Sequence, residues 1–231
     1  MIKFECRKCG FCCKKFGKGK GLPLWEWEVE KIKNAASEKN ISVNIKPISA
    51  FFDKKSKIAF CMGYAMFNEP CPFLENNSCS IYLIMPIVCR VFPLAKTPFF
   101  SKDKEVNLDK FAHCQNFDHR LFIDNYTQYG NIKKMSPKET KKDYREAYGE
   151  CYDYCFQNDM IGDYLQRIIN DLIEKGRIKL RKINELDYEK YKIYSFSEFL
   201  EKIGINMRDI FDLFGNHKKL NLFIEDLKKG K

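Results

Sequence analysis

The spacing of its cysteines constrains this chain more than any other feature of the sequence. Eleven cysteines occur in 231 residues, and seven of them fall into two runs. Close-set thiolates repel one another unless a cation lies between them, and in proteins that cation is usually zinc or the iron of an iron–sulfur cluster. We therefore expect a metal site in the N-terminal half. The first run contains Cys6, Cys9, Cys12 and Cys13, and the second contains Cys71, Cys79 and Cys89.

The composition predicts the cellular compartment, and the compartment in turn favours one role for the cysteines. Hydrophobic residues make up 45% of the chain, as in globular proteins, and no apolar leader follows Met1. The longest apolar run, residues 81–89, is interrupted by Pro86 and is too short to cross a bilayer. We expect a cytoplasmic protein without membrane contact, whose cysteines bind metal in preference to forming disulfides.

The net charge of +10 is concentrated near the first cysteine run. Residues 1–20 hold seven basic side chains and a single acid, Glu5. Two interpretations are open: a contact with nucleic acid, or lysines that offset the negative charge left by four thiolates around a metal. Aromatic residues for base stacking are sparse in this stretch, so we favour charge compensation and keep nucleic acid as the less favoured partner.

Hydrophobic periodicity predicts short elements in the first half. We expect a helix over residues 24–40, a short strand from Ile41 up to Pro47, and a second strand over 57–67. A turn is expected at residues 76–78, and a short helix carrying Cys89 should begin at Pro86. Residues 94–120, which include Cys114, are expected to be irregular.

The second half has the sequence pattern of helices. Residues 136–139, Ser-Pro-Lys-Glu, form a capping box from which a helix should run to about Asn158. A second helix should extend from about Ile161 to Gly176, and another capping box lies at residues 195–198. The expected fold class is α+β: a small, irregular, metal-supported cysteine-rich domain over 1–120, then a helical region over 121–231 that docks a partner protein.

The cysteine spacing allows more than one ligand set. Three thiols spaced as Cys6, Cys9 and Cys12 can wrap a four-iron cluster, with a fourth from a distant Cys-Pro such as Cys71. Zinc would instead take a pair from the first run and a pair from the second. Because Cys13 is adjacent to Cys12, its side chain should diverge, either toward a second centre or into packing. The thiols available for a second centre with Cys13 are Cys79, Cys89 and Cys114.

The motifs together resemble a known family. They are Cys6-x2-Cys9-Gly10-x-Cys12-Cys13, Cys71-Pro72-Phe73-Leu74, Cys79-x-Ile81-Tyr82, Pro86-x2-Cys89-Arg90 and Phe92-Pro93. Over residues 4–115 the chain is similar to the YkgJ-like cysteine-cluster family, a zinc- or iron-chelating CxxCxxCC domain that also resembles a region of flagellin lysine-N-methylases. Met85 departs from the family, which often has arginine before the proline.

The resemblance implies metal binding without a settled reaction. The leading hypothesis is a [4Fe–4S] protein with a redox or accessory role, and the alternative is a structural zinc module for interactions. A third hypothesis, implied by the methylases, is protein lysine methyl transfer, with Arg90 and Tyr82 as pocket residues. No catalytic residue is assigned. Cys61, Cys151 and Cys155 are expected to be packing residues, because they lie within an apolar strand or helix face.

Overall fold

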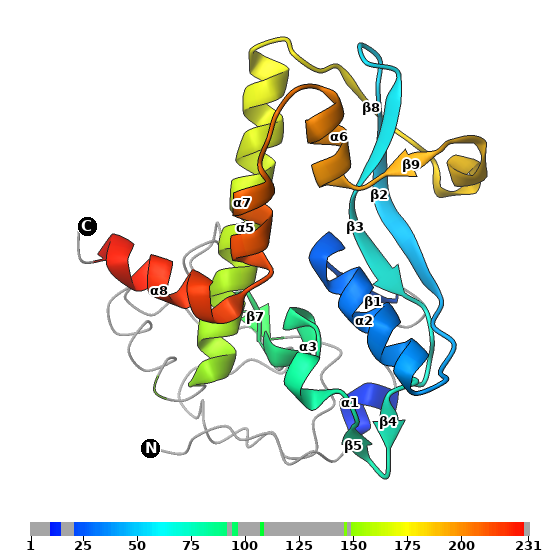
Figure 1. The fold of residues 1–231 in the computed structure, drawn as a ribbon, viewed down its shortest axis with the longest axis vertical. Helices are drawn as coiled ribbons and strands as arrows, with labels where there is room; N and C mark the ends of the chain where they lie inside the picture. Colours follow the sequence, from blue (N-terminus) through cyan, green and yellow to red (C-terminus); the bar gives the residue numbers. More distant parts are fainter. Residues whose placement is uncertain are drawn as a thin grey trace. The chain divides into compact units, whose positions relative to one another are not determined.

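The computed structural model describes residues 10–14, 21–91, 94–96, 107–108, 146 and 149–228 of the chain. These fall into two compact units, each assembled from two separate chain segments (Figure 1). Unit 1 comprises residues 1–22 and 68–163, and unit 2 comprises residues 23–67 and 164–231. The long helix α5 (Glu150–Glu174) contributes its first part to unit 1 and its last part to unit 2.

Unit 2 is organised around a five-stranded sheet. Its centre is a hairpin of β2 (Ile45–Asp53) and β3 (Ile58–Met66), paired from Ile45–Met66 to Asp53–Ile58. β8 (Leu180–Lys182) pairs antiparallel with the end of β2, while β1 (Leu22–Leu24) and β9 (Ile193–Tyr194) pair with β3. Two of the five strands therefore arrive from the C-terminal part of the sequence.

Helices cover β3 and complete the core of unit 2. α2 (Glu26–Glu38) and α6 (Phe196–Lys202) both contact β3. Phe60 of β3 is fully buried, and its ring stacks on that of Phe199 with centroids 4.0 Å apart. α6 starts with a capping box in which Ser195 and Glu198 exchange hydrogen bonds, as the sequence predicts.

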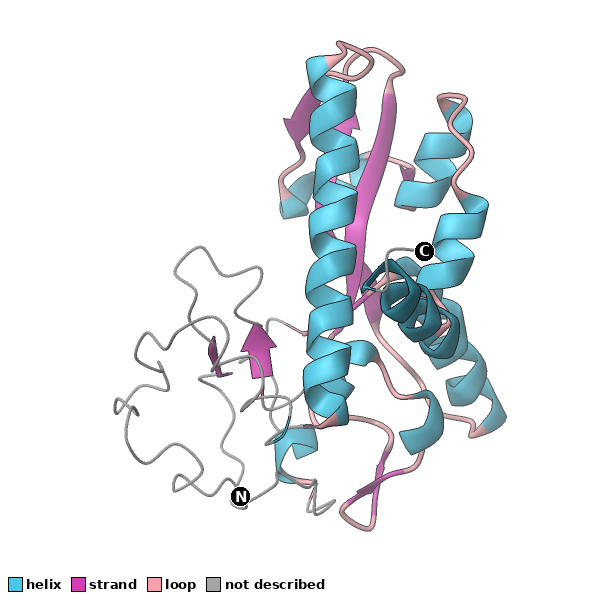
Figure 2. Ribbon diagram, turned by 90° about the vertical axis from the view of Figure 1, so that its left-hand side faces the viewer, coloured by secondary structure: helices cyan, strands magenta, loops and turns pink. Residues whose placement is uncertain are grey.

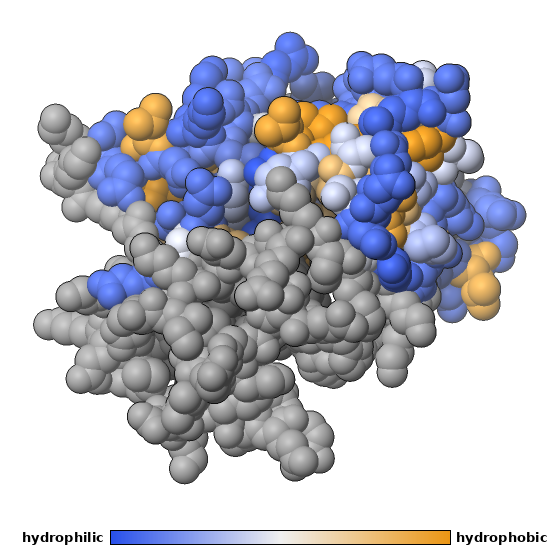
Figure 3. Space-filling model, turned by 90° about the horizontal axis from the view of Figure 1, so that it is seen from below, coloured by the Kyte–Doolittle hydropathy of each residue, from blue (hydrophilic) through white to orange (hydrophobic). Residues whose placement is uncertain are grey.

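Two further helices follow in unit 2. α7 (Arg208–Phe214) contacts α2, where Trp27 packs against Phe211 and Phe214 at 5.9 and 5.7 Å between ring centroids. α8 (His217–Lys228) contacts α7. The described residues on the face seen in Figure 3 are mostly hydrophilic, with apolar side chains in small separate groups, which is ordinary for a globular surface.

A glycine ends α5 in the way that the sequence predicts. Gly176 has a φ of +63°, and its N–H donates to the Ile173 carbonyl oxygen at 2.9 Å. The next amide, Arg177 N–H, donates to the Leu172 carbonyl oxygen at 2.8 Å, which completes a Schellman motif. The chain therefore leaves α5 sharply and returns toward the sheet as β8 (Figure 2).

The described part of unit 1 consists of short elements before α5. They are α1 (Phe11–Lys14), β4 (Leu74–Glu75), β5 (Ser78–Cys79), η2 (Tyr82–Ile84), α3 (Ile87–Val91), β6 (Leu94–Lys96) and β7 (Asn107–Leu108). β4 and β5 form one small antiparallel pair, and β6 and β7 form another. Each of these elements is only two to five residues long.

The α+β class is confirmed, while several element boundaries differ from the sequence prediction. The strand expected from Ile41 up to Pro47 is in fact β2, which starts at Ile45 and continues through Pro47 to Asp53. α5 is continuous where two helices were expected, and the region expected to be irregular contains the β6–β7 pair. The helix start at Ser136 and the domain boundary near residue 120 lie outside the described residues.

Candidate metal centre

The two cysteine runs meet at a backbone hydrogen bond. Cys71 N–H donates to the carbonyl oxygen of Cys13 at 2.8 Å, which ties the end of α1 to the start of the second run. Within α1, Cys13 N–H donates to the Gly10 carbonyl oxygen at 3.1 Å and closes a single helical turn. Segments almost 60 residues apart therefore lie side by side where the sequence predicted a shared site.

Gly10 permits a close approach between the first run and the β4–β5 hairpin. A Cβ at this position would lie 2.8 Å from both the Asn77 carbonyl oxygen and Leu74 Cδ1, and the residue has a φ of +69°. Any other side chain would both clash and strain the backbone. On the opposite side of the contact, Asn76 and Asn77 have φ values of +48° and +62° and form the tight turn between the strands.

The hairpin positions Cys71 and Cys79. Leu74 N–H donates to the Cys71 carbonyl oxygen at 3.1 Å, and Leu74 is the register partner of Cys79. Ser80 N–H donates to the Phe73 carbonyl oxygen at 2.9 Å, and the Phe73 side chain is almost fully buried. The buried Phe73 side chain thus fixes the β4–β5 hairpin, and with it the positions of Cys71, just before β4, and Cys79 in β5.

Exposure distinguishes Cys61 and Cys155 from the other described thiols. The side chains of Cys13, Cys71, Cys79 and Cys89 are partly exposed. Cys61 and Cys155 are buried, with 1% and 0% of their surface exposed, and Cys151 is partly exposed. Burial raises the pKa of the Cys61 thiol to about 11 and also raises that of Cys155. A buried thiol that stays protonated is a packing residue and a poor metal ligand.

A complete set of metal ligands cannot be assembled from the described side chains alone. No group of three or more candidate ligands converges among the described residues. Each set expected from the sequence includes at least one thiol outside them, because Cys6, Cys9 and Cys114 and the side chain of Cys12 are not described. Those ligand assignments remain predictions.

The chemistry of the described residues fits a thiolate-bound metal. Cys13, Cys71, Cys79 and Cys89 supply soft sulfur donors, which suit zinc or iron. Beside Cys79, the hydroxyl of Ser80 is buried and has no hydrogen-bond partner within the described part of the chain. A metal-bound sulfur accepts hydrogen bonds, so this hydroxyl is a suitable neighbour for such a site.

Arg90 follows Cys89 in α3, and the resemblance to the methylases suggests it as a pocket residue. Its guanidinium instead donates to three backbone carbonyl oxygens: Met85 at 3.2 Å, Tyr82 at 3.3 Å and Leu83 at 2.6 Å. Its remaining contact is with Tyr154 of α5, whose hydroxyl lies 3.4 Å from Nη1 and whose ring centroid lies 5.1 Å from Cζ. Arg90 therefore fastens η2 to α3 and α5, and Tyr82 takes part through its carbonyl group.

Two of these features were not anticipated from the sequence. Nothing in the local sequence pattern links Tyr154 to Arg90. Ser80 carries no sequence signal beyond its position next to Cys79. The Arg90–Tyr154 contact and the burial of the Ser80 hydroxyl both depend on the three-dimensional backbone path of η2 and the β4–β5 hairpin.

Comparison with known proteins supports the interpretation of this region. Residues 5–110, just under half of the chain, match the model of the CxxCxxCC family, described as a "putative zinc- or iron-chelating domain". Residues 5–110 are therefore similar to the CxxCxxCC family, and we refer to them as the CxxCxxCC domain. Metal binding is thus the expected property of the CxxCxxCC domain, with zinc or iron as the metal. No curated protein and no solved structure matches the chain.

The CxxCxxCC domain does not coincide with one compact unit. It includes Cys13, Cys71, Cys79 and Cys89 of unit 1 but also the β2–β3 hairpin of unit 2. Among the helices of the described regions, none has the length and apolar character needed to span a membrane.

Proposed function

We propose that the CxxCxxCC domain holds a [4Fe–4S] cluster through Cys6, Cys9, Cys12 and Cys71 and serves as a redox or accessory module. The observation that supports this proposal most is the hydrogen bond from Cys71 N–H to the Cys13 carbonyl oxygen at 2.8 Å. It brings a Cys-Pro beside the end of a Cys-x2-Cys-x2-Cys run, which is the relation that a four-iron cluster requires of its distant ligand. When bound, the cluster would supply one-electron transfer.

Zinc is the second candidate, and the architecture of unit 1 favours a structural role for it. The described elements of unit 1 that precede α5 are only two to five residues long. Such elements bury little apolar surface, and metal binding by thiolates contributes directly to folding free energy. A structural zinc site would therefore explain how this region keeps a defined fold.

Anaerobic purification followed by metal analysis and visible spectroscopy separates the two candidates. An iron–sulfur cluster gives a brown protein with about four irons and four sulfides per chain. A colourless protein with stoichiometric zinc, and no cluster formed on reconstitution, would reject the iron–sulfur proposal.

Cysteine variants test the division between ligand and packing thiols. Cys71→Ser and Cys9→Ser should lower metal content and thermal stability sharply. The matched control is Cys155→Ala, which changes a buried thiol of unit 1 and should keep the metal. Loss of metal in the control would show that the helix thiols take part in binding.

We further propose that a protein partner docks on the helical region. On α8, Leu222 and Phe223 are 68% and 47% exposed, although the same helix buries Leu220 completely. Exposed large apolar side chains beside a buried stripe are typical of an interaction surface. Replacing both by Ser should leave the fold intact and abolish co-purification of such a partner.

A further inference from the structure

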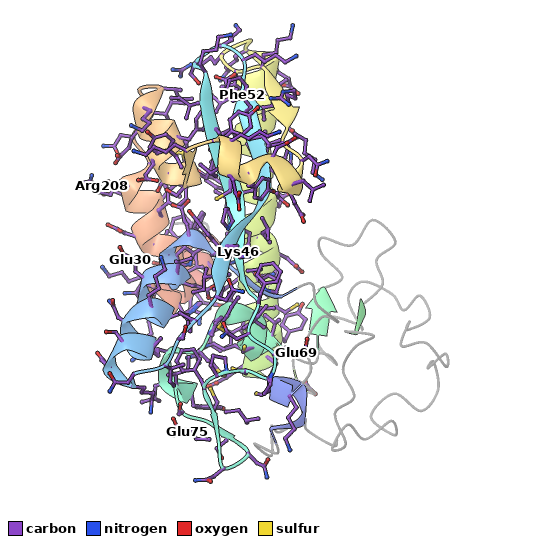
Figure 4. All side chains as sticks on the ribbon, turned by 90° about the vertical axis from the view of Figure 1, so that its right-hand side faces the viewer. Glu30, Lys46, Phe52, Glu69, Glu75 and Arg208 are labelled. Atoms are coloured by element: carbon purple, nitrogen blue, oxygen red, sulfur yellow. The ribbon has the colours of Figure 1, made fainter. Side chains whose placement is uncertain are left out.

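One end of the unit 2 sheet concentrates basic side chains that the metal centre does not use. The turn between β2 and β3 contains three exposed lysines, and the chain that leaves α5 contains five exposed basic residues. The segments 54–57 and 175–182 together contain eight basic residues and no acidic one. The end of the sheet where they lie is near the labelled Phe52 in Figure 4, where nitrogen-tipped side chains project outward.

Specific contacts hold the two basic segments together. Phe52 of β2 is the register partner of Arg181 of β8, and Lys54 N–H donates to the Lys179 carbonyl oxygen at 2.9 Å. Lys55 Nζ donates to the carbonyl oxygen of Gly176, which lies 121 residues away in sequence. The charge concentration is therefore a product of the fold and cannot be seen in either segment alone.

Asp53, at the end of β2 beside this surface, is turned inward. Asp53 is fully buried, and its carboxylate accepts from Lys179 N–H at 2.7 Å, Ser56 N–H at 2.9 Å, Ser56 Oγ–H at 2.6 Å and Lys55 N–H at 3.2 Å. Three backbone N–H groups and the Ser56 hydroxyl therefore satisfy the carboxylate oxygens. Asp53 thus fastens the two segments and leaves the exposed ammonium groups uncompensated.

Most of the lysines have no acidic partner. Within the described part of the chain, the ammonium groups of Lys54, Lys57, Lys179 and Lys182 form no ion pair, whereas Lys175 pairs with Asp171 at 2.9 Å. Uncompensated like charges held in proximity repel one another, and this cost is recovered when a polyanion binds. The arrangement therefore indicates a binding surface for repeated negative charge.

The spacing of the basic side chains suits a phosphate backbone. Arg177, Lys179 and Arg181 are exposed, and they alternate with Ile178, which is buried, and Leu180, which is partly buried. Side chains two residues apart in an extended chain repeat at about 6.6 Å, comparable with successive phosphates along one strand. A row of cations at that repeat can follow a nucleic-acid strand.

Aromatic rings lie among the basic residues. The Arg181 guanidinium lies over the Phe52 ring at 5.6 Å, and Nη2 donates to the Tyr191 hydroxyl at 2.8 Å. At the opposite edge of the hairpin, the Tyr194 ring has Lys192 and Lys202 at 5.0 and 4.5 Å from its centroid. Rings flanked by cations provide stacking surfaces for bases, and stacking does not depend on sequence.

We propose that this end of the sheet binds the phosphate backbone of single-stranded nucleic acid, without sequence preference. Charged residues on β8 also protect an edge strand from pairing, but that role does not account for the lysines of the β2–β3 turn. An anionic membrane would require apolar side chains projecting among the cations. Ile178 and Leu180 face inward, although Ile173 of α5 is 45% exposed, so the membrane belongs in the test.

The test measures fluorescence anisotropy of a labelled single-stranded RNA of about 20 nucleotides, long enough for one binding site, with the metal-loaded full-length chain. The patch variant combines Lys54→Gln, Lys57→Gln, Lys179→Gln and Lys182→Gln. The matched control combines Lys33→Gln, Lys46→Gln, Lys218→Gln and Lys219→Gln, which are exposed residues of unit 2 and remove the same charge. Circular dichroism checks that both variants fold.

We expect the patch variant to bind at least about tenfold more weakly, with the slope of log K against log salt reduced by about 2 to 3, because each lost phosphate contact contributes about 0.7. The control should bind within about twofold of the wild type. Equal losses in both variants, or RNA binding that the patch variant retains, would overturn the proposal. Patch-dependent binding to anionic vesicles without RNA binding would overturn it in favour of a membrane surface.

Discussion

Asp53 offers the sharpest test of how unit 2 is held together. We predict that Asp53→Ala destabilises this unit by about 3 kcal/mol. The side chain is fully buried and accepts four hydrogen bonds, one from Lys179, just before β8, and three from the β2–β3 turn. Removing it leaves the Lys179 amide without its acceptor and removes one of the contacts between the segment leading into β8 and the hairpin.

The magnitude follows from the accessibility of each donor. A hydrogen bond to a charged group contributes about 1.5–3 kcal/mol to stability. Water can replace the carboxylate at the Lys55 and Ser56 donors, which lie in an exposed turn, so we count the full loss at Lys179 and a partial loss for the rest. Asp53→Asn keeps the shape and one acceptor oxygen, so its cost should be about half as large.

Tryptophan fluorescence makes the measurement specific to unit 2. The chain has two tryptophans, Trp25 and Trp27, and both belong to this unit. Their rings stack at 5.5 Å, and Trp27 also packs against α7, so the emission should change when the unit unfolds. Urea unfolding monitored this way gives the free-energy difference between variant and wild type.

The pH dependence gives an independent check. Burial alone would raise the pKa of the Asp53 carboxyl, but the hydrogen bonds from Lys179, Ser56 and Lys55 together outweigh it and hold the pKa below its ordinary value of 3.8. The stabilisation is therefore fully present above pH 3.8 and is lost as the pH falls through the folded-state pKa. The difference between wild type and Asp53→Ala should shrink accordingly in acid.

The control for Asp53 is Asp171→Ala, which removes an exposed partner of Lys175. Surface ion pairs contribute little, so the control should cost less than about 0.5 kcal/mol. The reasoning is refuted if Asp53→Ala costs under about 1 kcal/mol, or if its effect is the same in acid as at neutral pH.

Three further predictions concern other parts of the structure. Phe60→Ala removes a fully buried ring stacked on Phe199 and should cost about 4 kcal/mol in the same urea assay; a cost below about 2 would contradict the packing described. Arg90→Lys should speed hydrogen exchange across residues 82–91, because an ammonium group cannot reach the four acceptors of the guanidinium; unchanged exchange would argue against the clamp. Cys61, which is 1% exposed with a thiol pKa of about 11, should resist iodoacetamide at pH 8 until the protein unfolds, and rapid labelling of the native chain, read by mass spectrometry, would show otherwise.

The sequence predicts those helices, strands and helix ends that are determined by residues close together in the chain. α2, β3, the α6 capping box and the glycine stop of α5 all follow from periodicity or capping residues, and the structure confirms them. β2 was misplaced because Pro47 was taken as the end of a strand. Pro47 is tolerated since β8 pairs only with residues 51–53, so this stretch of β2 has a free edge.

Other elements could not be found from local patterns. β8 and β9 have three and two residues, too few for a periodicity to appear, and both exist because the β2–β3 hairpin offers them edges. The break expected near Asn158 does not occur, since polar residues cost a helix interior less than about 0.7 kcal/mol each. Packing along α5 outweighs that cost.

For the candidate centre, spacing groups Cys71 with the first run, and the hydrogen bond to Cys13 places the two backbone segments next to each other. The ligand set itself stays a prediction. The role of Arg90 was not predictable, because the directions of the Tyr82, Leu83 and Met85 carbonyl groups depend on the backbone path of η2. A guanidinium seeks acceptors of any kind, and sequence does not show which ones face it.

The interleaving of the two units has a consequence for how the chain acquires its fold during synthesis. When the segment matched by the family leaves the ribosome, β2 and β3 are present, but β8, β9 and α6 have still to be made. Until then Phe60 lacks Phe199, and the hairpin has open edges on which other chains can pair. A recombinant fragment cut at residue 110 would keep those edges permanently, so we expect it to aggregate even when its cysteines are saturated with metal.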